Sequence, residues 1–240
     1  MYRGKRIIGI APVLNERLKI GHVIERIPRD AVDEILVVDD GSTDGSQEVA
    51  RSRGARIIEL GSTLGVGVAI RTGYEHAVQS GFDIAVVMAG NNKDSPEEIP
   101  LLLDPIIDGE VDVVQGSRWL SNTNDLGDMP AYRRFATRLH PALFNMIAGS
   151  KLTDTTNGFR AVSTEVLSDP GLDLAQGWLD EYELEVYLLF KAVKLGYRVE
   201  EVPVTKRYPP KALGQTKMKP IVGWWSILRP IPLLGLGIKK

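Results

Sequence analysis

Ile35-Leu-Val-Val-Asp-Asp-Gly-Ser-Thr-Asp44 is an apolar run that ends abruptly in carboxylates and a glycine. Its branched residues are typical of a buried parallel strand, and Gly41 with the polar residues after it indicates a turn into a helix. Asp39 and Asp40 therefore stand at the carboxyl end of a strand, where open α/β sheets bind ligands. Carboxylates there suit hydrogen-bond donors such as a base N–H or ribose hydroxyls. A local role is the alternative, with Asp40 satisfying the turn and Asp44 capping the next helix.

The composition is that of a globular chain with little net charge. The 240 residues include 29 basic and 31 acidic side chains, so no overall field draws the chain to nucleic acid and we expect no nucleic-acid partner. The absence of cysteine excludes disulfides and thiolate metal sites and fits a reducing, cytoplasmic compartment. The widely separated histidines, His22, His76 and His140, offer no metal-ligand spacing.

Strand and helix patterns alternate along the chain, which predicts an α/β fold with a mostly parallel sheet and helices on both faces. The expected strands lie near Arg6–Ile10, Ile35–Asp39, Arg56–Leu60, Ile84–Met88, Val111–Gln115 and Val199–Val204. The expected helices lie near Glu16–Ile27, Asp44–Ser52, Val66–Gln79, Pro96–Ile107 (with Ser95 as a capping serine), Tyr132–Ala148 and Asp180–Leu195. The length suits a single domain over residues 1–220, followed by an apolar C-terminal tail at 221–240.

A second motif precedes the first. Ile7-Ile-Gly-Ile-Ala-Pro-Val-Leu-Asn-Glu16 is a short apolar strand with a proline-bearing turn, after which Asn15 and Glu16 open an amphipathic helix. In this order, the two motifs resemble those of the family 2 glycosyltransferases, which are inverting enzymes with a Rossmann-like GT-A fold that use nucleotide-sugar donors. The resemblance implies that residues of both motifs hold the donor nucleotide, namely Pro12, Asn15, Glu16, Asp39 and Asp40.

Gly65-Val-Gly-Val-Ala-Ile-Arg-Thr-Gly73 also resembles that family, in which a glycine-rich helix start carries a basic residue near the nucleotide. Glycines let the backbone approach a ligand, and a helix N-terminus together with Arg71 favours anions. The alternative is that the glycines serve close helix packing while Arg71 lies on a solvated face.

The segment after the expected strand Ile84–Met88 departs from the family. Similar enzymes show Asp-x-Asp there, followed by Pro-Glu, whereas this chain has Met88-Ala-Gly-Asn-Asn-Lys-Asp-Ser-Pro-Glu-Glu98. Pro96 fixes the register, so Ala89 replaces the first aspartate and Asn91 the second. A hard divalent cation prefers charged oxygens, so the loss of both charges weakens Mg²⁺ or Mn²⁺ binding or makes the metal dispensable.

Three interpretations of this segment remain open. In the first, a metal is still held by Asn91 with Asp94 as a replacement ligand. In the second, the Lys93 ammonium neutralises the donor diphosphate without a metal. In the third, the site is degenerate and the chain only binds nucleotide sugars.

Further motifs resemble the dolichol-phosphate mannose synthase-like branch, which transfers sugars to polyprenyl phosphates. These are Gln115-Gly-Ser-Arg118, Asp128-Met-Pro-Ala-Tyr-Arg-Arg134, Asp154-Thr-Thr-Asn-Gly-Phe-Arg160, Glu181-Tyr-Glu-Leu-Glu185, Val202-Pro-Val204 and Gly214-Gln-Thr-Lys-Met218. The resemblance implies that the donor diphosphate and an acceptor phosphate are held by basic residues of these motifs, Arg118, Arg133, Arg160 and Lys217. An ionised acceptor phosphate needs no strong base, but Asp154 or Glu181 could serve a hydroxyl acceptor.

The segment Ile221–Ile238 is the most apolar part of the chain. Arg229, Pro230 and Pro232 interrupt it, which argues against a membrane span. Trp224 and Trp225 with nearby lysines fit an interfacial anchor at the inner face of a membrane, so we expect peripheral membrane association. Packing onto the domain or a contact between copies in a homo-oligomer is the alternative.

The sequence therefore predicts a GT-A glycosyltransferase of cell-envelope or polysaccharide biosynthesis. It would move a sugar from a nucleoside diphosphate donor to a polyprenyl phosphate. Two alternatives remain: transfer to a hydroxyl of a soluble or glycan acceptor, and a catalytically inactive nucleotide-sugar-binding module.

Overall fold

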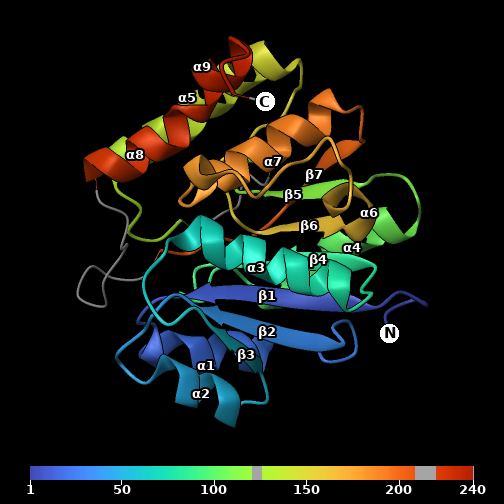
Figure 1. Ribbon diagram of the computed structural model, residues 1–240, viewed down its shortest axis with the longest axis vertical. Helices are drawn as coiled ribbons and strands as arrows, with labels where there is room; N and C mark the ends of the chain where they lie inside the picture. Colours follow the sequence, from blue (N-terminus) through green and yellow to red (C-terminus); the bar gives the residue numbers. More distant parts are fainter. Residues whose placement is uncertain (121–125, 209–219, 240) are drawn as a thin grey trace.

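A seven-stranded sheet with the order β3-β2-β1-β4-β6-β5-β7 forms the centre of the computed structural model (Figure 1), which describes residues 1–120, 126–208 and 220–239. Its strands are β1 (Ile7–Val13), β2 (Glu34–Asp39), β3 (Arg56–Glu59), β4 (Ile84–Val87), β5 (Val113–Ser117), β6 (Arg160–Ser163) and β7 (Val199–Pro203). Strand β6 runs antiparallel to both β4 and β5, and the other neighbouring strands pair in parallel. The mostly parallel sheet with helices on both faces is confirmed, but the sequence patterns missed β6.

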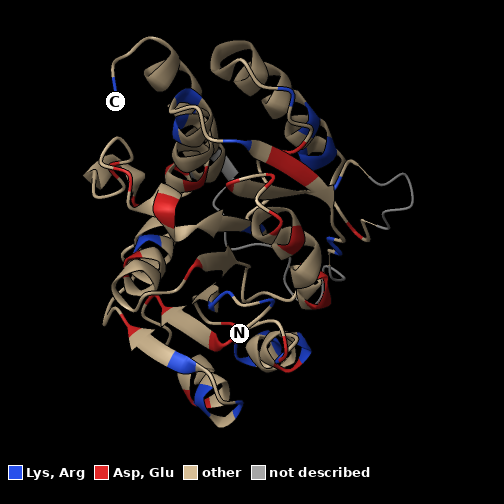
Figure 2. Cartoon of the chain, turned by 90° about the vertical axis from the view of Figure 1, so that its right-hand side faces the viewer, with Lys and Arg blue, Asp and Glu red and all other residues tan. Residues whose placement is uncertain are grey.

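Helices cover both faces of the sheet. They are α1 (Arg17–Arg26), α2 (Ser46–Ser52), α3 (Val66–Gln79), α4 (Ile99–Ile107), α5 (Ala131–Ala148), α6 (Thr164–Leu167), α7 (Glu183–Lys194), α8 (Pro220–Leu228) and α9 (Pro230–Gly235), with 3₁₀ turns at Pro96–Glu98 and Gly177–Leu179. Ser95 stands before the first of these turns, but its side chain makes no capping hydrogen bond. Basic and acidic residues are interspersed through the molecule (Figure 2).

Two hydrophobic clusters explain why the strands are apolar throughout. Ile7 packs with α1 and α4 on one face of the sheet, whereas its neighbour Ile8 packs with α3 and α7 on the other. Because successive side chains of a strand point to opposite faces, a strand that is covered on both faces needs apolar residues at every position. The run Ile35–Val38 meets this requirement, since every side chain in it is buried.

The sheet topology gathers polar loops at one edge. The parallel strands β1, β2 and β4 end there. Strand β5 also ends there, because β6 runs antiparallel to both β4 and β5, so that these two strands point the same way. The residues that precede β6 reach the same edge because that strand runs in the opposite direction. Segments far apart in the sequence therefore meet beside one another, at the place where open α/β sheets bind ligands.

The C-terminal helices α8 and α9 pack onto the domain, and Figure 1 shows them beside α5, at the end of the molecule opposite α1 and α2. Ile231 and Leu234 of α9 belong to the larger hydrophobic cluster. Arg229 pairs with the buried Glu183 at 2.6 Å, and the His140 ring of α5 lies 3.1 Å from the Ile227 carbonyl oxygen. Within the described residues, we find no helix that is both long and apolar enough to cross a membrane.

Replacement of Arg229 tests how far this attachment stabilises the fold. Arg229→Ala would leave the Glu183 carboxylate buried without its cation, so we expect the free energy of unfolding to fall by about 1–3 kcal/mol. Urea denaturation measures this change. Arg229→Lys, which keeps the charge, should recover part of the loss, and an unchanged midpoint for Arg229→Ala would show that the ion pair contributes no stability.

Candidate active site

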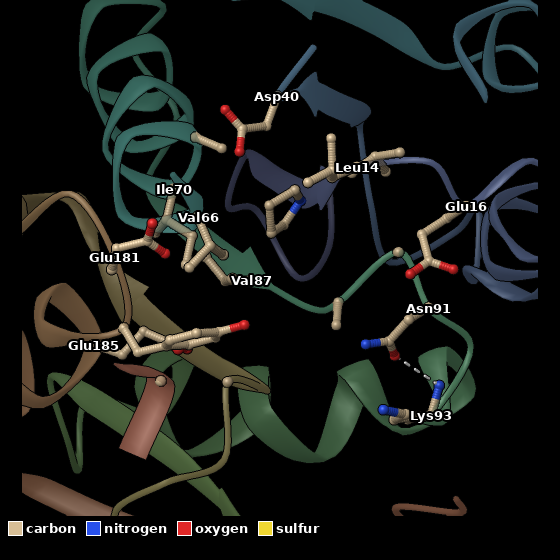
Figure 3. Close-up of a pocket in the computed structure, with 18 of the residues that line it drawn as sticks. Leu14, Glu16, Asp40, Val66, Ile70, Val87, Asn91, Lys93, Glu181 and Glu185 are labelled. Carbon is tan, nitrogen blue, oxygen red and sulfur yellow. Dashed lines mark hydrogen bonds between the residues drawn. The ribbon is translucent and has the colours of Figure 1, made fainter. Parts of the chain in front are cut away.

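A cavity of about 680 Å³ opens at the edge of the sheet where these loops meet. Its walls come from the turn after β1, the loops after β2 and β4, the start of α3, the turn before α7, and α8. Figure 3 shows Asp40 and Leu14 at one end of the cavity, Asn91 and Lys93 at a second, and Glu181 and Glu185 on the wall facing Asn91 and Lys93. Asp40 and Lys93 therefore lie at different ends of the cavity, and Glu16 lines it near Asn91.

Asp39 stands at the end of β2 beside the cavity and is only 1% exposed. Its Oδ2 accepts hydrogen bonds from the Ser42 backbone N–H and the Gln47 side-chain amide, both at 2.9 Å. Its buried Oδ1 has no hydrogen-bond partner among the described residues. A buried carboxylate oxygen without a donor is costly, so this atom would accept a hydrogen bond from any ligand N–H or O–H that reaches it, although Asp39 itself is not part of the cavity wall.

Asp40 fills the local role that the sequence left open. Its carboxylate accepts from the backbone N–H groups of Leu64 and Gly65, at 2.6 and 3.1 Å, and so fixes the turn into α3. Burial raises the pKa of the Asp40 carboxyl. The side chain still lines the cavity, but its oxygens already serve the backbone.

The turn after β1 is tied to the loop after β2. Asn15 has a left-handed backbone (φ 51°), and its Oδ1 accepts from the Thr43 N–H at 2.8 Å. Glu16 pairs with Lys19 at 3.0 Å. Pro12, Asn15 and Glu16, for which the family resemblance implies a role in donor binding, all line the cavity.

The start of α3 does not offer the anion site that was one interpretation of its glycines. A Cβ at Gly65 or Gly67 would lie 2.2 Å from the Asp180 carbonyl oxygen or 2.0 Å from that of Leu179, so these glycines allow close backbone packing. The Gly67 N–H donates to the Asp180 carbonyl oxygen at 2.8 Å. Arg71 donates to the Leu174 carbonyl oxygen and to Asp180, and it is not part of the cavity wall. The expected contact between Arg71 and the nucleotide is therefore wrong.

The loop after β4 does not fit a divalent metal. The Asn91 side-chain oxygen accepts from the Lys93 backbone N–H at 3.2 Å. Asp94 pairs with Lys206 at 2.6 Å and accepts from the Ala89 N–H at 3.2 Å, so both of its oxygens are engaged. In the part of the chain that the structure describes, no group of three or more Asp, Glu, His or Cys side chains could hold a metal ion. In this structure Asp94 is therefore engaged by Lys206 rather than open to a metal ion, and its predicted role as a replacement metal ligand stays a prediction.

The cationic end of the cavity is built around Tyr208. The Lys93 ammonium lies 5.2 Å and the Arg133 guanidinium carbon 5.6 Å from the centre of its ring, while Arg118 donates to its hydroxyl at 3.0 Å. Burial lowers the pKa of Lys93 to about 7, and the charges of Arg133 and Lys206 act in the same direction. An anion bound at this end would relieve this crowding of like charges.

Arg118 is held in place by Asp154. The guanidinium donates to both carboxylate oxygens of Asp154, at 2.6 and 2.7 Å, and the carboxylate is fully buried. Burial alone would raise the pKa of Asp154, but the Arg118 charge outweighs it and keeps that pKa below its usual value. Asp154 thus holds Arg118 in place, and its burial and ion pair argue against the alternative that it acts as a general base.

Arg160 also lies away from the cavity. It is 1% exposed and donates to the backbone carbonyl oxygens of Glu185 and Asn157, at 2.8 and 2.9 Å. Its expected role in phosphate binding is therefore replaced by a structural one. Glu181 does line the cavity, whereas Lys217 lies outside the described residues.

Among the contributors to the wall that sequence reasoning did not assign to the site are Lys206, Tyr208 and Trp224 of α8. Lys206 and Tyr208 follow the Val202-Pro-Val204 motif, which could have drawn attention to them. Nothing local in the sequence marks their partners, because Lys206 meets Asp94 across 112 residues.

The fold and this polarised cavity define a GT-A glycosyltransferase. Residues 10–170 match the family described as Glycosyl transferase family 2, and the chain belongs to that family. It is 31% identical over 223 residues to an undecaprenyl-phosphate mannosyltransferase of Micrococcus luteus, which covers 89% of this chain and 87% of the relative. It is 34% identical over 220 residues to a dolichyl-phosphate hexose transferase of Haloferax volcanii, with 90% and 88% covered.

The fold has solved counterparts. The glucosyl-3-phosphoglycerate synthase of Mycobacterium tuberculosis, in complex with Mn²⁺, UDP and phosphoglyceric acid, matches with a TM-score of 0.69 at 23% identity. The match covers 99% of this chain and 80% of the synthase. At that identity, the similarity establishes the fold alone.

Asp39 offers a direct test of the nucleoside end. Asp39→Ala removes the unsatisfied acceptor, so we expect a loss of about 1.5–3 kcal/mol in nucleoside diphosphate affinity, as for a hydrogen bond to a charged group. Calorimetric titration with UDP and GDP measures this loss. Asp108→Ala, a surface change elsewhere, is the control, and unchanged affinity in a folded Asp39→Ala protein would remove Asp39 from the site.

Proton uptake tests the cationic end. Because the pKa of Lys93 is about 7 in the empty cavity, much of this lysine is neutral at pH 8, and a bound diphosphate raises its pKa and returns its charge. We expect up to about one proton to be taken up on binding at pH 8. The dependence of the binding enthalpy on the ionisation enthalpy of the buffer measures it. Equal proton uptake by Lys93→Met would contradict the assignment.

Proposed function

We propose that this glycosyltransferase moves a sugar from a nucleoside diphosphate donor to a polyprenyl phosphate. The observation that carries the proposal is the combination of the unsatisfied Asp39 oxygen, next in sequence to the cavity residue Asp40, with the cationic end of the cavity around Tyr208. The first suits a nucleoside and the second suits phosphates. The names of the relatives from Micrococcus luteus and Haloferax volcanii support the acceptor class.

The chemistry follows from an acceptor that is already ionised. An oxygen of the acceptor phosphate attacks the anomeric carbon, a new C–O bond forms, and the bond to the donor diphosphate breaks with its electron pair on the leaving oxygen. The leaving diphosphate gains charge in the transition state, and Lys93 and Arg133 stabilise it there. Arg118, fixed by Asp154, holds phosphate at the same end.

Transfer to a hydroxyl acceptor is the second candidate. Glu181 lies on the wall that faces Asn91 and Lys93 (Figure 3), which is where a base would stand for attack opposite the leaving group. A hydroxyl acceptor needs such a base because its oxygen is neutral at pH 7.

Paired acceptors separate the two candidates. With a panel of sugar nucleotides and a detergent-solubilised short-chain polyprenyl phosphate, we expect a polyprenyl-phosphate sugar as product. The matching polyprenol should react at least tenfold more slowly, equivalent to about 1.4 kcal/mol in the barrier. Equal rates, together with a large loss of activity in Glu181→Gln, would favour the hydroxyl acceptor. No transfer to any acceptor, with tight nucleotide-sugar binding, would indicate the inactive module.

We also propose that the enzyme works at the inner, cytoplasmic face of a membrane, through α5 and α8. Phe135 is 69% exposed and Trp225 62% exposed. Tyr132, Leu139 and Met146 continue the apolar stripe of α5 at helical spacing, and the exposed Arg134 and Arg138 lie beside it. An apolar stripe with flanking arginines suits an anionic lipid surface.

A pair of leucine variants tests this surface. Leu139→Asp on α5 should weaken co-sedimentation with anionic vesicles by about tenfold, because a buried leucine contributes about 1.5–3 kcal/mol. Leu101→Asp on α4 is the matched control, since the two leucines are 45% and 47% exposed. Unchanged vesicle binding for Leu139→Asp, with self-association in the intact protein, would assign the stripe to a contact between two copies.

A further inference from the structure

Ala89 and Asn91 stand where similar enzymes carry the aspartates of Asp-x-Asp, so Asp94 is the carboxylate that remains in the loop after β4. This carboxylate forms an ion pair with Lys206. Asp94 is 3% exposed, and its Oδ1 lies 2.6 Å from the Lys206 ammonium nitrogen. Its Oδ2 accepts from the backbone N–H of Ala89, the position where similar enzymes carry their first aspartate. A divalent cation could reach Asp94 only by displacing this ammonium.

Lys206 is fixed from several sides. Its ammonium also donates to the Asn157 side-chain oxygen at 2.7 Å. The backbone of Lys206 forms an antiparallel bridge with Asp94, and the next residue, Arg207, donates its N–H to the Lys93 carbonyl oxygen at 2.9 Å. Both the backbone and the ammonium of Lys206 are therefore held in place.

The ammonium is fixed at the wall of the cavity. Lys206 is 9% exposed and lines the cavity together with Lys93. An ammonium has three N–H groups, and the described contacts of Lys206, to Asp94 and Asn157, account for two of them. One N–H remains for a ligand in the cavity.

We propose that the Lys206 ammonium, held by Asp94 and Asn157, replaces the divalent cation as the fixed positive charge that binds the donor diphosphate. The inference rests on the proposed function, because it assumes a nucleoside diphosphate in this cavity. Asp94 and Asn157 supply oxygen ligands as they would to a metal ion, but the cation that they hold is part of the chain.

The charge balance fits this assignment. A divalent cation brings two positive charges to a diphosphate, and here the neighbouring ammoniums of Lys206 and Lys93 bring one each. The Asp94 carboxylate offsets part of this charge when the cavity is empty, which makes a buried ammonium tolerable before the donor arrives. The Arg133 guanidinium adds a further cation at the same end.

Nucleotide binding tests the proposal without relying on turnover. UDP, GDP, UMP and GMP are titrated calorimetrically into the intact chain, once with EDTA and once with Mn²⁺. We expect the affinity for the bound diphosphate to differ by less than threefold between the two conditions. Electron paramagnetic resonance of Mn²⁺ should show no ion taken up with the nucleotide.

A paired variant isolates the ammonium. Lys206→Met alone would leave Asp94 buried and unpaired, so Asp94→Asn and Lys206→Met are combined, and a thermal melt confirms folding. We expect this variant to bind the diphosphate at least tenfold more weakly in EDTA, with less than threefold loss for the monophosphate. Asp112→Asn with Arg198→Met removes another ion pair, of 2.9 Å, as the matched control.

The outcomes separate this proposal from the proposed function. Diphosphate binding that requires Mn²⁺ in the intact chain overturns the lysine assignment and leaves the transferase intact. An equal loss of mono- and diphosphate binding in the paired variant, or no loss, also overturns it, since the pair is then structural. Binding of no nucleotide by the intact chain would overturn the proposed function itself.

Discussion

A buried charge must have a partner, and this constraint shapes the functional edge of the sheet. Asp94 with Lys206 joins the loop after β4 to the segment after β7, and Arg118 with Asp154 joins the end of β5 to the turn before β6. Breaking either pair by removing one partner would leave a charge with little access to water. These contacts therefore hold loops from distant parts of the sequence in one geometry, and the cavity lies among them.

The same constraint explains why the cavity has two ends. Carboxylates of the loop after β2 are satisfied mainly by backbone N–H groups, which leaves Asp39 Oδ1 as an acceptor. At the other end, Lys93 and Arg133 lie over the ring of Tyr208, and the protein positions these basic groups there before a ligand binds. Charges arranged in advance stabilise a developing anion without the cost of reorganisation.

Much of the fold could be predicted from the sequence, because the signals were local. The strand Ile35–Asp39 was marked by a continuous apolar run and the helix Val66–Gln79 by its sequence pattern, and the structure places both within one residue of the prediction. Strand β6 was missed because Arg160–Ser163 is short and begins with a buried arginine, which is atypical of a strand interior. The apolar tail was recognised, but its periodicity did not reveal α8 and α9.

The site was predicted less completely, because a residue type does not specify its partner. Asp39 and Lys93 were identified from their places beside strand ends. Arg71 and Arg160 lie in segments that match family motifs. In the structure, however, their guanidinium groups bind backbone carbonyl oxygens and carboxylates away from the cavity. Lys206 could not be found from local sequence, since only the folded chain brings it to Asp94.

The central claim is that one cavity binds the base at Asp39 and the diphosphate at lysines rather than at a metal. A crystal structure of the complex with a nucleoside diphosphate, grown with Mn²⁺ and analysed for anomalous scattering, tests it most directly. We expect the base or ribose to donate to Asp39 Oδ1, phosphate oxygens to contact Lys93 and Lys206, and no Mn²⁺ peak beside Asn91. A Mn²⁺ ion bound to Asp94 with Lys206 displaced, or a nucleotide bound elsewhere, would contradict the account.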